Sequence, residues 1–544
     1  MPRTARKRPR GLIVLCPLVA GLLQLDCSSP PQILDISPGR GVRDVPTNAP
    51  IRIHFDRAVE RASVASRFSL RPHVGGEITW EPSNTLVFRH DTLDPSHLYT
   101  VVLAGGYRDS AGNVNGFNHG WSFRTEPSPE LRTSAPAQGE VQVDPASYLT
   151  LAFSREMSAE SFRGAVTFSP SVPFTVRSDP TDERRVLIAP RSLLSTNTDY
   201  QVSISGDALD QDGNHLPPQK LHFAVGRIRS LSRWITFVAS ESGADTGSGV
   251  WMVDEAGFPR LLEETSTDDF SWSPDGSNLL VRHPDFTWTD YPLGAAPLTM
   301  PFSAEWAAHL GARSGYVYLD GSRLNRLLPS GDTVTIASGV VQASVSRDLN
   351  RIAFSQAAPG GSEIWAYDVQ LRAKYRVQRE SELISSITWA PDGTRLAYML
   401  SSGGAGQEVL KLKSLVGSAA ATSVATGEIA DPAWLADSSD LVFSARLDQA
   451  GKRRWRIFRV NTALPPARLT VAAAIGPAAA DAFLPRPSPD GHQIAFLVGA
   501  PQSAQVWLMN ADGTGQNRLT GFDSEAFPYS CRALHWASSC LSGL

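Results

Sequence analysis

Several motifs that mark enzymes are missing from this chain of 544 residues. It contains neither the G-x-S-x-G turn of serine hydrolases nor the H-E-x-x-H helix of zinc peptidases. Its 11 histidines are scattered, with no pair at the spacing of metal ligands. The glycines at 401–406 are not followed by Lys and Ser or Thr, so they do not form a phosphate loop. No local catalytic motif therefore indicates an enzyme.

Cysteine is also scarce, with four in the chain. No cysteine pair lies within residues 27–126 or 127–226, so those segments must be stabilised by apolar cores alone. Only two cysteines follow Cys27, and a lone close pair in an exported protein predicts a disulfide between Cys531 and Cys540. Two free or separately buried thiols are the alternative.

Charged residues make up 19% of the chain, and the formal net charge is −4. Loss of residues 1–26 would remove five basic side chains and one acidic one and would leave a charge of −8. Because an acidic surface repels phosphate backbones, we do not expect nucleic acid as a partner.

Long apolar runs are absent except near the N-terminus, where Gly11–Leu25 follows five basic residues. That run is shorter than the roughly 20 residues of a membrane-spanning helix, so we interpret residues 1–26 as a signal peptide. The Cys27-Ser-Ser-Pro-Pro stretch resembles the start of a bacterial lipoprotein. The resemblance implies a lipid on Cys27 and an exported protein, in the periplasm or at the cell surface, anchored to the outer membrane. Because Gln24-Leu25-Asp26 departs from the family's pattern, simple secretion and an uncleaved anchor remain alternatives.

A short phrase recurs through the second half of the chain. SWSPDG at 271–276 returns as TWAPDG at 388–393 and RPSPDG at 486–491, with weaker copies between them. We take seven positions as equivalent: Trp272, Trp306, Val345, Trp389, Trp434, Pro487 and Trp536. Their mean spacing of about 44 residues is typical of β-propeller blades. Each copy is followed by a short apolar strand.

The repeat also predicts how the ring closes. Counted from the phrase, blades begin near 234, 269, 304, 343, 386, 431 and 484. Seven blades are favoured, and six remain possible because the unit at 304–338 is eroded. No repeat phrase precedes the strand WITFVAS at 234–240, and CRALHW at 531–536 would supply the missing partner strand. Such closure removes exposed sheet edges.

The phrase, its Leu-Ala-Tyr or Ile-Ala-Phe strand and MNADGTGQNRLT at 509–520 resemble the TolB-type, WD-like repeat of bacterial periplasmic proteins. The resemblance implies a propeller over 227–544. That family carries an α/β domain ahead of its propeller, and this chain has something else there, so the family's role in envelope maintenance does not carry over.

Ser-Pro-Asp-Gly itself is turn chemistry, because proline presets φ, aspartate caps the turn and glycine accepts a positive φ. We interpret the phrase as blade geometry, with a direct ligand role as the alternative. Trp272, Trp389 and Trp434 occupy one position of the repeat and are interpreted as packing between blades. Sugar stacking is the alternative.

Two segments of about 100 residues precede the propeller and are copies of each other. Ser-Pro-x-x-Gly at 37–41 aligns with Ala-Pro-x-x-Gly at 135–139, and Phe55 aligns with Phe153, at one constant offset. Apolar and polar residues alternate in their strands, which predicts sandwiches with one buried face per sheet. The opening, DSAGN at 109–113 and the closing SFRT resemble bacterial Ig-like domains of the S-layer and adhesin kind, which implies spacer modules.

The best metal candidate lies in the second copy. Asp210, Asp212 and Asn214 place oxygen ligands at alternate positions, as a calcium loop requires. The first copy makes the same turn with Asp109 and Asn113 but lacks the middle acid. A self-capped turn is therefore the favoured interpretation and calcium the alternative, and no other cofactor is expected.

The sequence thus predicts an all-β protein, with two tandem Ig-like β-sandwiches followed by a β-propeller closed by a C-terminal strand. We expect a non-catalytic binding or scaffold protein that recognises an envelope protein or polysaccharide. The alternatives are an enzyme, such as a lyase or lactonase-like hydrolase at the channel mouth, and a purely structural envelope component. A cluster of His, Asp or Glu at one mouth would favour the enzyme, and an aromatic rim would favour binding.

Overall fold

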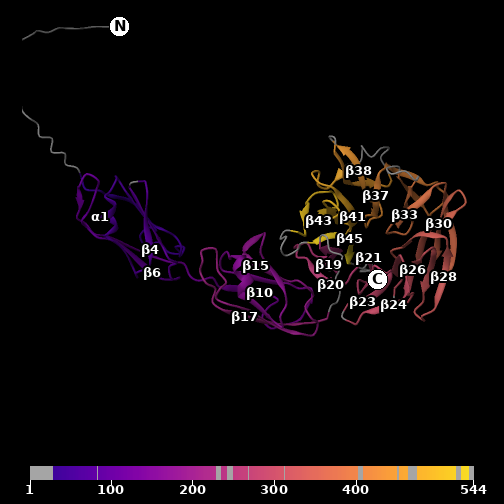
Figure 1. The fold of residues 1–544 in the computed structure, drawn as a ribbon, viewed down its shortest axis with the longest axis horizontal. Helices are drawn as coiled ribbons and strands as arrows, with labels where there is room; N and C mark the ends of the chain where they lie inside the picture. Colours follow the sequence, from indigo (N-terminus) through magenta and orange to yellow (C-terminus); the bar gives the residue numbers. More distant parts are fainter. Residues whose placement is uncertain are drawn as a thin grey trace, which may run out of the picture. The chain divides into compact units, whose positions relative to one another are not determined.

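The computed structural model describes residues 29–82, 84–227, 234–241, 249–267, 269–293, 295–311, 313–401, 408–449, 452–463, 474–521 and 529–537. Its ribbon is drawn in Figure 1. The chain divides into two compact units, Met1–Pro129 with Asp210–His215, and Glu130–Leu209 with Leu216–Leu544. No helix within the described ranges is long and apolar enough to cross a membrane.

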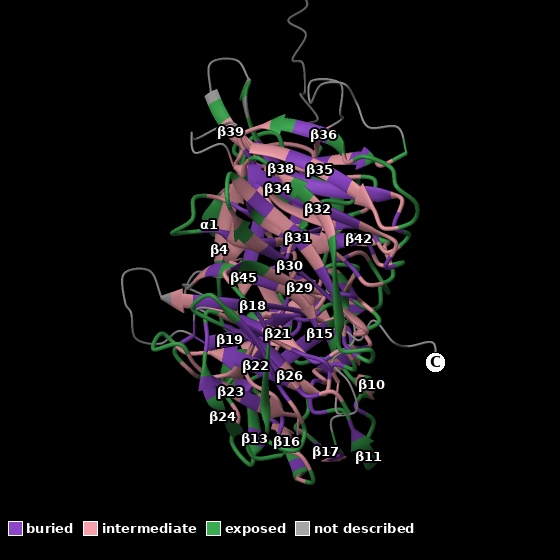
Figure 2. Cartoon of the chain, turned by 90° about the vertical axis from the view of Figure 1, so that its right-hand side faces the viewer, coloured by how far each residue is buried: buried purple, intermediate pink, exposed green. Residues whose placement is uncertain are grey.

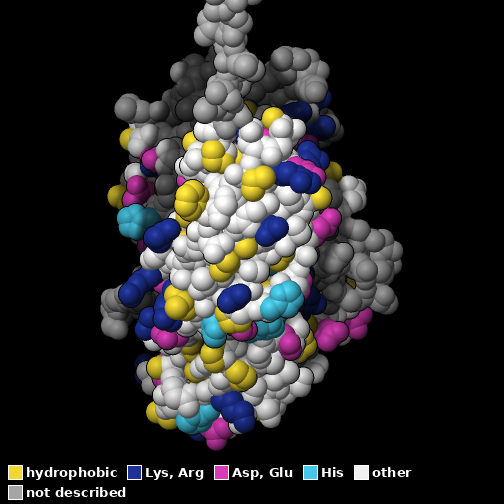
Figure 3. All heavy atoms as spheres, turned by 90° about the vertical axis from the view of Figure 1, so that its left-hand side faces the viewer, with side chains coloured by type: hydrophobic (Ala, Val, Ile, Leu, Met, Phe, Trp, Pro, Cys, Tyr) yellow, Lys and Arg dark blue, Asp and Glu magenta, His cyan; other side chains and the backbone are white. Residues whose placement is uncertain are grey.

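The first unit contains an Ig-like sandwich. One sheet has the order β1 (Ile33–Ser37), β2 (Ile51–Phe55), β5 (Thr85–His90) and β4 (Gly76–Glu81), and the other has β3 (Phe68–Arg71), β6 (Leu98–Leu103) and β9 (His119–Arg124). Shorter elements are α1 (Arg61–Ala65), β7 (Tyr107–Arg108) and β8 (Val114–Asn115). As the alternation predicts, Ile51, Ile53 and Phe55 are fully buried. On the face seen in Figure 3, charged side chains of both signs are interspersed with small groups of apolar ones.

The second copy builds the same sandwich at the start of the second unit. One sheet has the order β10 (Leu131–Ala135), β12 (Leu149–Phe153), β15 (Asp182–Pro190) and β14 (Phe174–Asp179), and the other has β11 (Glu140–Val143), β17 (Gln219–Val225), β16 (Asp199–Ile204) and β13 (Val166–Ser169). Two short helices, η1 (Ala159–Ser161) and α2 (Phe162–Ala165), precede β13. Buried Tyr99 and Tyr200 occupy equivalent sites, and each hydroxyl accepts a backbone N–H bond, at 3.0 and 3.1 Å. The predicted duplication is confirmed.

The described strands from Trp234 onward form seven four-stranded antiparallel sheets, arranged as a ring (Figure 1). Blades 1 to 3 are β45 (Tyr529–Ala537), β18 (Trp234–Glu241), β19 (Gly249–Val253), β20 (Arg260–Glu263); β21 (Asp269–Trp272), β22 (Asn278–Arg282), β23 (Thr287–Pro292), β24 (Leu298–Ser303); and β25 (Trp306–His309), β26 (Tyr316–Asp320), β27 (Arg323–Leu327), β28 (Thr333–Ser338). Blades 4 and 5 are β29 (Val340–Val345), β30 (Arg351–Ala358), β31 (Gly361–Asp368), β32 (Ala373–Glu380); and β33 (Leu383–Trp389), β34 (Arg395–Ser401), β35 (Glu408–Ser414), β36 (Thr422–Gly427). Blades 6 and 7 are β37 (Ile429–Trp434), β38 (Asp440–Gln449), β39 (Lys452–Asn461), β40 (Ala474–Ile475); and β41 (Ala482–Pro487), β42 (Gln493–Val498), β43 (Gln505–Asn510), β44 (Asn517–Arg518).

The predicted closure is confirmed, because β45 pairs with β18 and joins the two ends of the propeller in blade 1. Between most neighbouring blades the first strands contact each other, so these strands line the ring axis. The second strands carry the apolar runs of the sequence and are almost wholly buried, as the purple segments of Figure 2 illustrate. Burial of these runs between blades supplies the core of the ring.

Within the second unit, the Ig-like domain packs against blade 1 through two arginines. Arg260 is fully buried, donates to the carbonyls of Ala146 and Ser147, and lies 5.5 Å from the centre of the Tyr148 ring. Burial lowers its pKa to about 10, opposed first by the Asp254 carboxylate. From the sandwich, Arg177 lies 3.8 Å over the Phe258 ring. These cation–π contacts and hydrogen bonds attach the second sandwich to the ring.

Candidate functional site

One residue at the end of each first strand sets how neighbouring blades meet. In blades 2 to 7, we define the ring position as the residue just before the one whose N–H closes the turn by donating to a carbonyl at the far end of that turn, as Trp272 precedes Ser273, which donates to Asn278. In blade 1, Trp536 pairs with Ile235 as Trp272 pairs with Leu279, so Trp536 holds the ring position there. In blades 1 to 7 the ring position is held by Trp536, Trp272, His309, Val345, Trp389, Trp434 and Pro487. The predicted equivalence of Trp306 is wrong, because Trp306 pairs with Leu319 at the other end of β25. His309 holds that place.

The tryptophans at the ring position connect neighbouring blades. Three of their indole N–H groups donate to the preceding blade: Trp272 to Thr236 Oγ1 (2.9 Å), Trp389 to the Ser344 carbonyl (3.0 Å) and Trp536 to the Arg486 carbonyl (2.7 Å). Trp434 is as buried as Trp389, but its Nε1 has no hydrogen-bond partner among the described residues. The geometry supports the interpretation of these residues as packing between blades.

The repeated Ser-Pro-Asp-Gly phrase behaves as the predicted turn. In blade 2, Asp275 Oδ1 accepts bonds from the Ser273 hydroxyl (2.6 Å) and the Ser277 N–H (3.1 Å), and Gly276 has a φ of 66°. Asp490 in blade 7 accepts the same two bonds, at 2.5 and 3.0 Å. These bonds cap the turn between the first and second strands.

The strands that precede these turns are bulged in three consecutive blades. Blades 6, 7 and 1 each carry one extra residue in the first strand, and the bulges contain Asp431, Leu484 and Ala533, each with a positive φ. A left-handed conformation is unfavourable for leucine and alanine, and such strain concentrates where a protein positions a functional side chain. Arg486 and His535 each lie two residues after the positive-φ residue of the bulge in their strand.

A cavity of about 350 Å³ opens at the end of the ring axis where these bulged strands finish. We call it the mouth cavity. It is lined by the first strands and turns of five blades, with these residues: Ser344, Val345, Arg347, Thr388, Trp389, Pro391, Ala433, Trp434, Ala436, Arg486, Pro487, Ser488, Pro489, His535 and Trp536. Indoles, prolines and two arginines dominate the described lining, and no carboxylate belongs to it.

Two arginines line the mouth cavity, and the Asp269 carboxylate lies 4.0 Å from Nε2 of His535. Arg486 donates to the Pro485 carbonyl at 3.2 Å, and Arg347 reaches the Pro489 carbonyl at 3.4 Å. Neither guanidinium forms an ion pair with any residue that the structure describes. Burial lowers the pKa of Arg486, with Asp431 and Asp269 opposing the shift. Burial and then Arg486 itself lower the pKa of His535, which is therefore neutral at pH 7.

Asp210, Asp212 and Asn214, the sequence's metal candidates, lie in a self-capped turn. Asp210 Oδ1 accepts the N–H groups of Asp212 and Asn214, at 3.0 and 2.8 Å, and its Oδ2 accepts the Asn214 amide at 2.8 Å. In the first copy, Asp109 accepts the corresponding bonds although the middle acid is missing. The turn thus forms without the middle acid. Within the described ranges, no three His, Cys, Asp or Glu side chains are placed to hold a metal ion.

The predicted cysteine sites are only partly described. Cys27, the lipidation candidate, and Cys540 lie outside the described residues. Cys531 is buried in blade 1, where its sulfur lies 3.8 Å from Thr520 Oγ1 and burial raises the thiol pKa to about 12. The disulfide between Cys531 and Cys540 stays a prediction.

Sequence reasoning missed Arg347, Arg486 and His309. One signal was available, because the residue before the ring position is small in five blades: Ser271, Ala308, Ser344, Thr388 and Ala433. Arg486 and His535 replace that small residue in blades 7 and 1. An alignment of the copies therefore marks both as unusual, although it does not show that they meet at the axis.

Comparisons with known proteins agree with this architecture. Residues 28–125 and 126–225 each match the family described as bacterial Ig-like domain, so the chain contains two such domains ahead of its propeller. No curated protein matches the chain.

Three solved structures are similar at low identity. TolB from Acinetobacter baumannii shares 14% identity and a TM-score of 0.37, over 70% of this chain and 86% of that one. A protein from Agrobacterium tumefaciens, provisionally assigned as TolB, has 16% sequence identity and a TM-score of 0.34, over 53% of this chain and 88% of that one. A eukaryotic initiation factor has 11% sequence identity and a TM-score of 0.33, over 57% of this chain and 100% of that one.

Proposed function

We propose that this chain is an exported, non-catalytic binding protein whose mouth cavity recognises an envelope protein or polysaccharide. The two Ig-like domains serve as spacers between a lipid anchor at Cys27 and the propeller. The single observation that carries the proposal is the lining of the mouth cavity. Three indoles and two arginines without ion-pair partners surround it, and its described lining has no Asp or Glu.

The same lining favours binding over catalysis. General acid–base chemistry needs a carboxylate or a titrating histidine within reach of the substrate. The mouth cavity offers one histidine, His535, which is held neutral beside Arg486, and the nearby Asp269 carboxylate, 4.0 Å from its Nε2, does not belong to the described lining. Arginine and tryptophan, by contrast, are the residues enriched where proteins bind other molecules.

The arginines also define what a ligand must supply. Arg486 is half-buried, and Asp431 and Asp269 act on it without forming an ion pair, so a charged partner would stabilise its partly desolvated guanidinium. Arg486 has one described hydrogen bond, to a carbonyl oxygen. An anionic group on the ligand would give this guanidinium the partner that it lacks, and the forked donor geometry of arginine suits a carboxylate or phosphate.

Site-directed cross-linking in the native envelope tests the proposal. A photoreactive amino acid at Ala436, which lines the mouth cavity, is expected to form adducts with one envelope protein or polysaccharide. The matched control places the same group at Thr333, an exposed residue of β28 in the outermost position of blade 3. The proposal predicts adducts from position 436 and none of the same kind from 333.

A second pair of variants separates recognition at the mouth cavity from non-specific binding elsewhere on the surface. Arg486→Glu should abolish the adduct at position 436, because a carboxylate there repels an anionic group. Arg323→Glu makes the same change of charge at an exposed site on β27 and should leave the adduct intact. Equal adducts from both variants, or from both cross-linking positions, would count against the mouth as the recognition site.

The anchor has its own test. Cys27→Ser removes the thiol that would carry the lipid, so the full-length protein should move from the membrane fraction to the soluble fraction. Unchanged partitioning would rule out lipidation at Cys27.

A further inference from the structure

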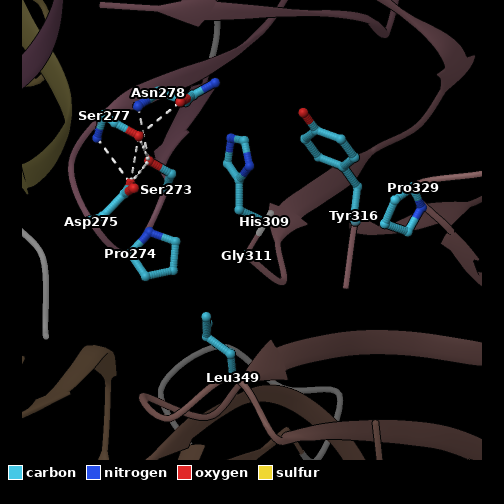
Figure 4. A pocket seen from close by; sticks show the side chains of 11 residues that line it. Ser273, Pro274, Asp275, Ser277, Asn278, His309, Gly311, Tyr316, Pro329 and Leu349 are labelled. Atoms are coloured by element: carbon cyan, nitrogen blue, oxygen red, sulfur yellow. Dashed lines mark hydrogen bonds between the residues drawn. The ribbon is translucent and has the colours of Figure 1, made fainter. Parts of the chain in front are cut away.

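A second cavity lies where blades 2, 3 and 4 meet (Figure 4), beside the mouth cavity, since Leu349 lines it and Arg347 of the same turn lines the mouth. We call it the junction cavity. Its volume is about 320 Å³, and it is lined by the turns after β21, β25 and β29 and the loop after β27. The described lining residues are Ser273, Pro274, Asp275, Ser277, Asn278, His309, Gly311, Gly315, Tyr316, Pro329 and Leu349.

The cavity lies where the repeat loses its tryptophan. His309 holds the ring position of blade 3, and an imidazole is much smaller than the indole found in four other blades. The following turn is also altered, because Leu-Gly-Ala-Arg at 310–313 replaces Ser-Pro-Asp-Gly and Gly315 stands where blade 2 has Asn278. A smaller side chain at a position built for an indole leaves unfilled space.

The wall of the cavity behind His309 is polar and unusually buried. Asp290 is 2% exposed and accepts bonds from the Tyr316 hydroxyl (2.7 Å) and the Asn278 amide (3.0 Å). Its other oxygen, Oδ1, lies 3.6 Å from Nε2 of His309, which is 8% exposed. That separation is too long for a hydrogen bond, and neither atom has another partner among the described residues.

The field in the junction cavity is negative. Burial raises the pKa of Asp275, but bonds from Ser273 and Ser277 outweigh it and hold the pKa below the ordinary value, so the carboxylate is charged. Burial lowers the pKa of His309 against the opposing effects of Asp290 and Asp275, so the ring is neutral. No basic side chain belongs to the described lining. Asp275 in the lining and Asp290 behind it therefore form no ion pair with a described Lys or Arg.

The remaining walls are apolar and aromatic. Pro274, Pro329 and Leu349 lie around the opening, and the Tyr316 ring lies 4.7 Å from the His309 ring (Figure 4). A phenol ring attracts a cation at its face, and prolines and leucine suit a methylene chain. The cavity thus combines carboxylates, an aromatic ring and an apolar entrance.

We propose that the junction cavity binds a primary alkylammonium group, with the ammonium among Asp275, His309 and Tyr316 and the alkyl chain against Pro274, Pro329 and Leu349. The neutral His309 ring supplies a hydrogen-bond acceptor, and the carboxylates supply the charge. This ligand differs from the anionic one expected at the mouth, so the two sites can be tested with different probes. A free alkylamine and the lysine side chain of a partner protein share this chemistry.

Calorimetric titration of the full chain tests the proposal at low ionic strength. The probes are n-pentylamine, the neutral n-pentanol, Nα-acetyl-lysine methylamide and its Nε-acetylated form. We expect pentylamine to bind in the millimolar range and at least about ten times more tightly than pentanol, which is a difference of about 1.4 kcal/mol. Tighter binding of the lysine derivative than of pentylamine assigns the site to a protein lysine, and the reverse order assigns it to a free amine.

Two variants locate the binding. His309→Trp restores the residue of the other blades and fills the cavity, so it should abolish pentylamine binding. Asp275→Asn keeps an acceptor for the turn and removes the charge, so it should weaken binding at least about fivefold. Arg486→Ala at the mouth should change nothing. Unfolding temperatures verify that each variant is folded.

Several results would overturn the proposal. They are equal binding of pentanol and pentylamine, unchanged binding by folded His309→Trp, or no heat with pentylamine at all. None of them bears on the mouth cavity, whose proposed ligand is tested with separate positions and variants.

Discussion

The junctions that keep a tryptophan at the ring position differ sharply from the junction that carries His309. Trp272, Trp389 and Trp536 each reach the preceding blade and donate one hydrogen bond there. His309 faces a carboxylate across 3.6 Å and lines a cavity of about 320 Å³. The pairing of the strands is the same in both cases. The exchange of an indole for His309, together with the altered turn after it, thus accompanies the change from a hydrogen-bonded junction to a polar cavity.

The largest effect should come from removing an indole. Trp389 is buried and is held by its bond to Ser344 and by Arg351, 5.0 Å from its ring centre. Trp389→Ala should destabilise the propeller by about 3 to 5 kcal/mol, because the change opens a large cavity. His309→Ala removes a smaller side chain without a hydrogen bond and should cost about 1 kcal/mol. Calorimetric unfolding of both variants measures the difference in stability. Equal destabilisation by the two substitutions would contradict the proposed difference between tryptophan and histidine junctions.

A smaller effect should separate two tryptophans. Trp389→Phe removes the indole N–H and leaves the Ser344 carbonyl without its donor, whereas Trp434→Phe removes an N–H that bonds to no described residue. Arginines lie at nearly equal distances over both rings, 5.0 and 5.2 Å, so the loss of ring area is matched. Trp389→Phe should therefore cost about 1 kcal/mol more than Trp434→Phe in denaturant unfolding. The opposite order would show that the bond to Ser344 does not stabilise the junction.

The smallest effect should be a dependence on pH at the histidine junction. The folded-state pKa of His309 is lowered by burial, although Asp290 and Asp275 oppose the shift and Tyr316 stays neutral. As the pH falls through about 6.5, the unfolded chain binds a proton at this residue that the folded chain does not. Stability should therefore fall more steeply between pH 7 and 5 in the wild type than in His309→Trp. Parallel curves for the two proteins would contradict this role.

Much of the fold was predictable because its signals are local. The Ser-Pro-Asp-Gly phrase encodes turn bonds that its own residues make, so its spacing gave the blade count. CRALHW was recognisable as the closing strand because the first unit had no partner strand. The constant offset between the two copies predicted a duplication, and the alternation of apolar and polar residues predicted that each copy is a sandwich.

The sites were less predictable, because their residues meet only through the ring. The sequence favours Trp306 as the ring residue because it is a tryptophan near the expected spacing, whereas strand pairing gives that place to His309. Arg347 comes from blade 4 and Arg486 from blade 7, and both line the mouth cavity at the end of the ring axis. The duplication likewise hid a difference. Tyr148 and Arg177 contact blade 1, while Pro50 and Thr79 stand at the equivalent positions of the first copy.

The central claim is that recognition occurs at the mouth cavity. Once the cross-linked envelope ligand is purified, its dissociation constant for three proteins tests that claim most directly. Arg486→Glu should weaken binding at least about tenfold, or about 1.4 kcal/mol, while His309→Trp should bind as tightly as the wild type. Unchanged binding by folded Arg486→Glu would contradict the account.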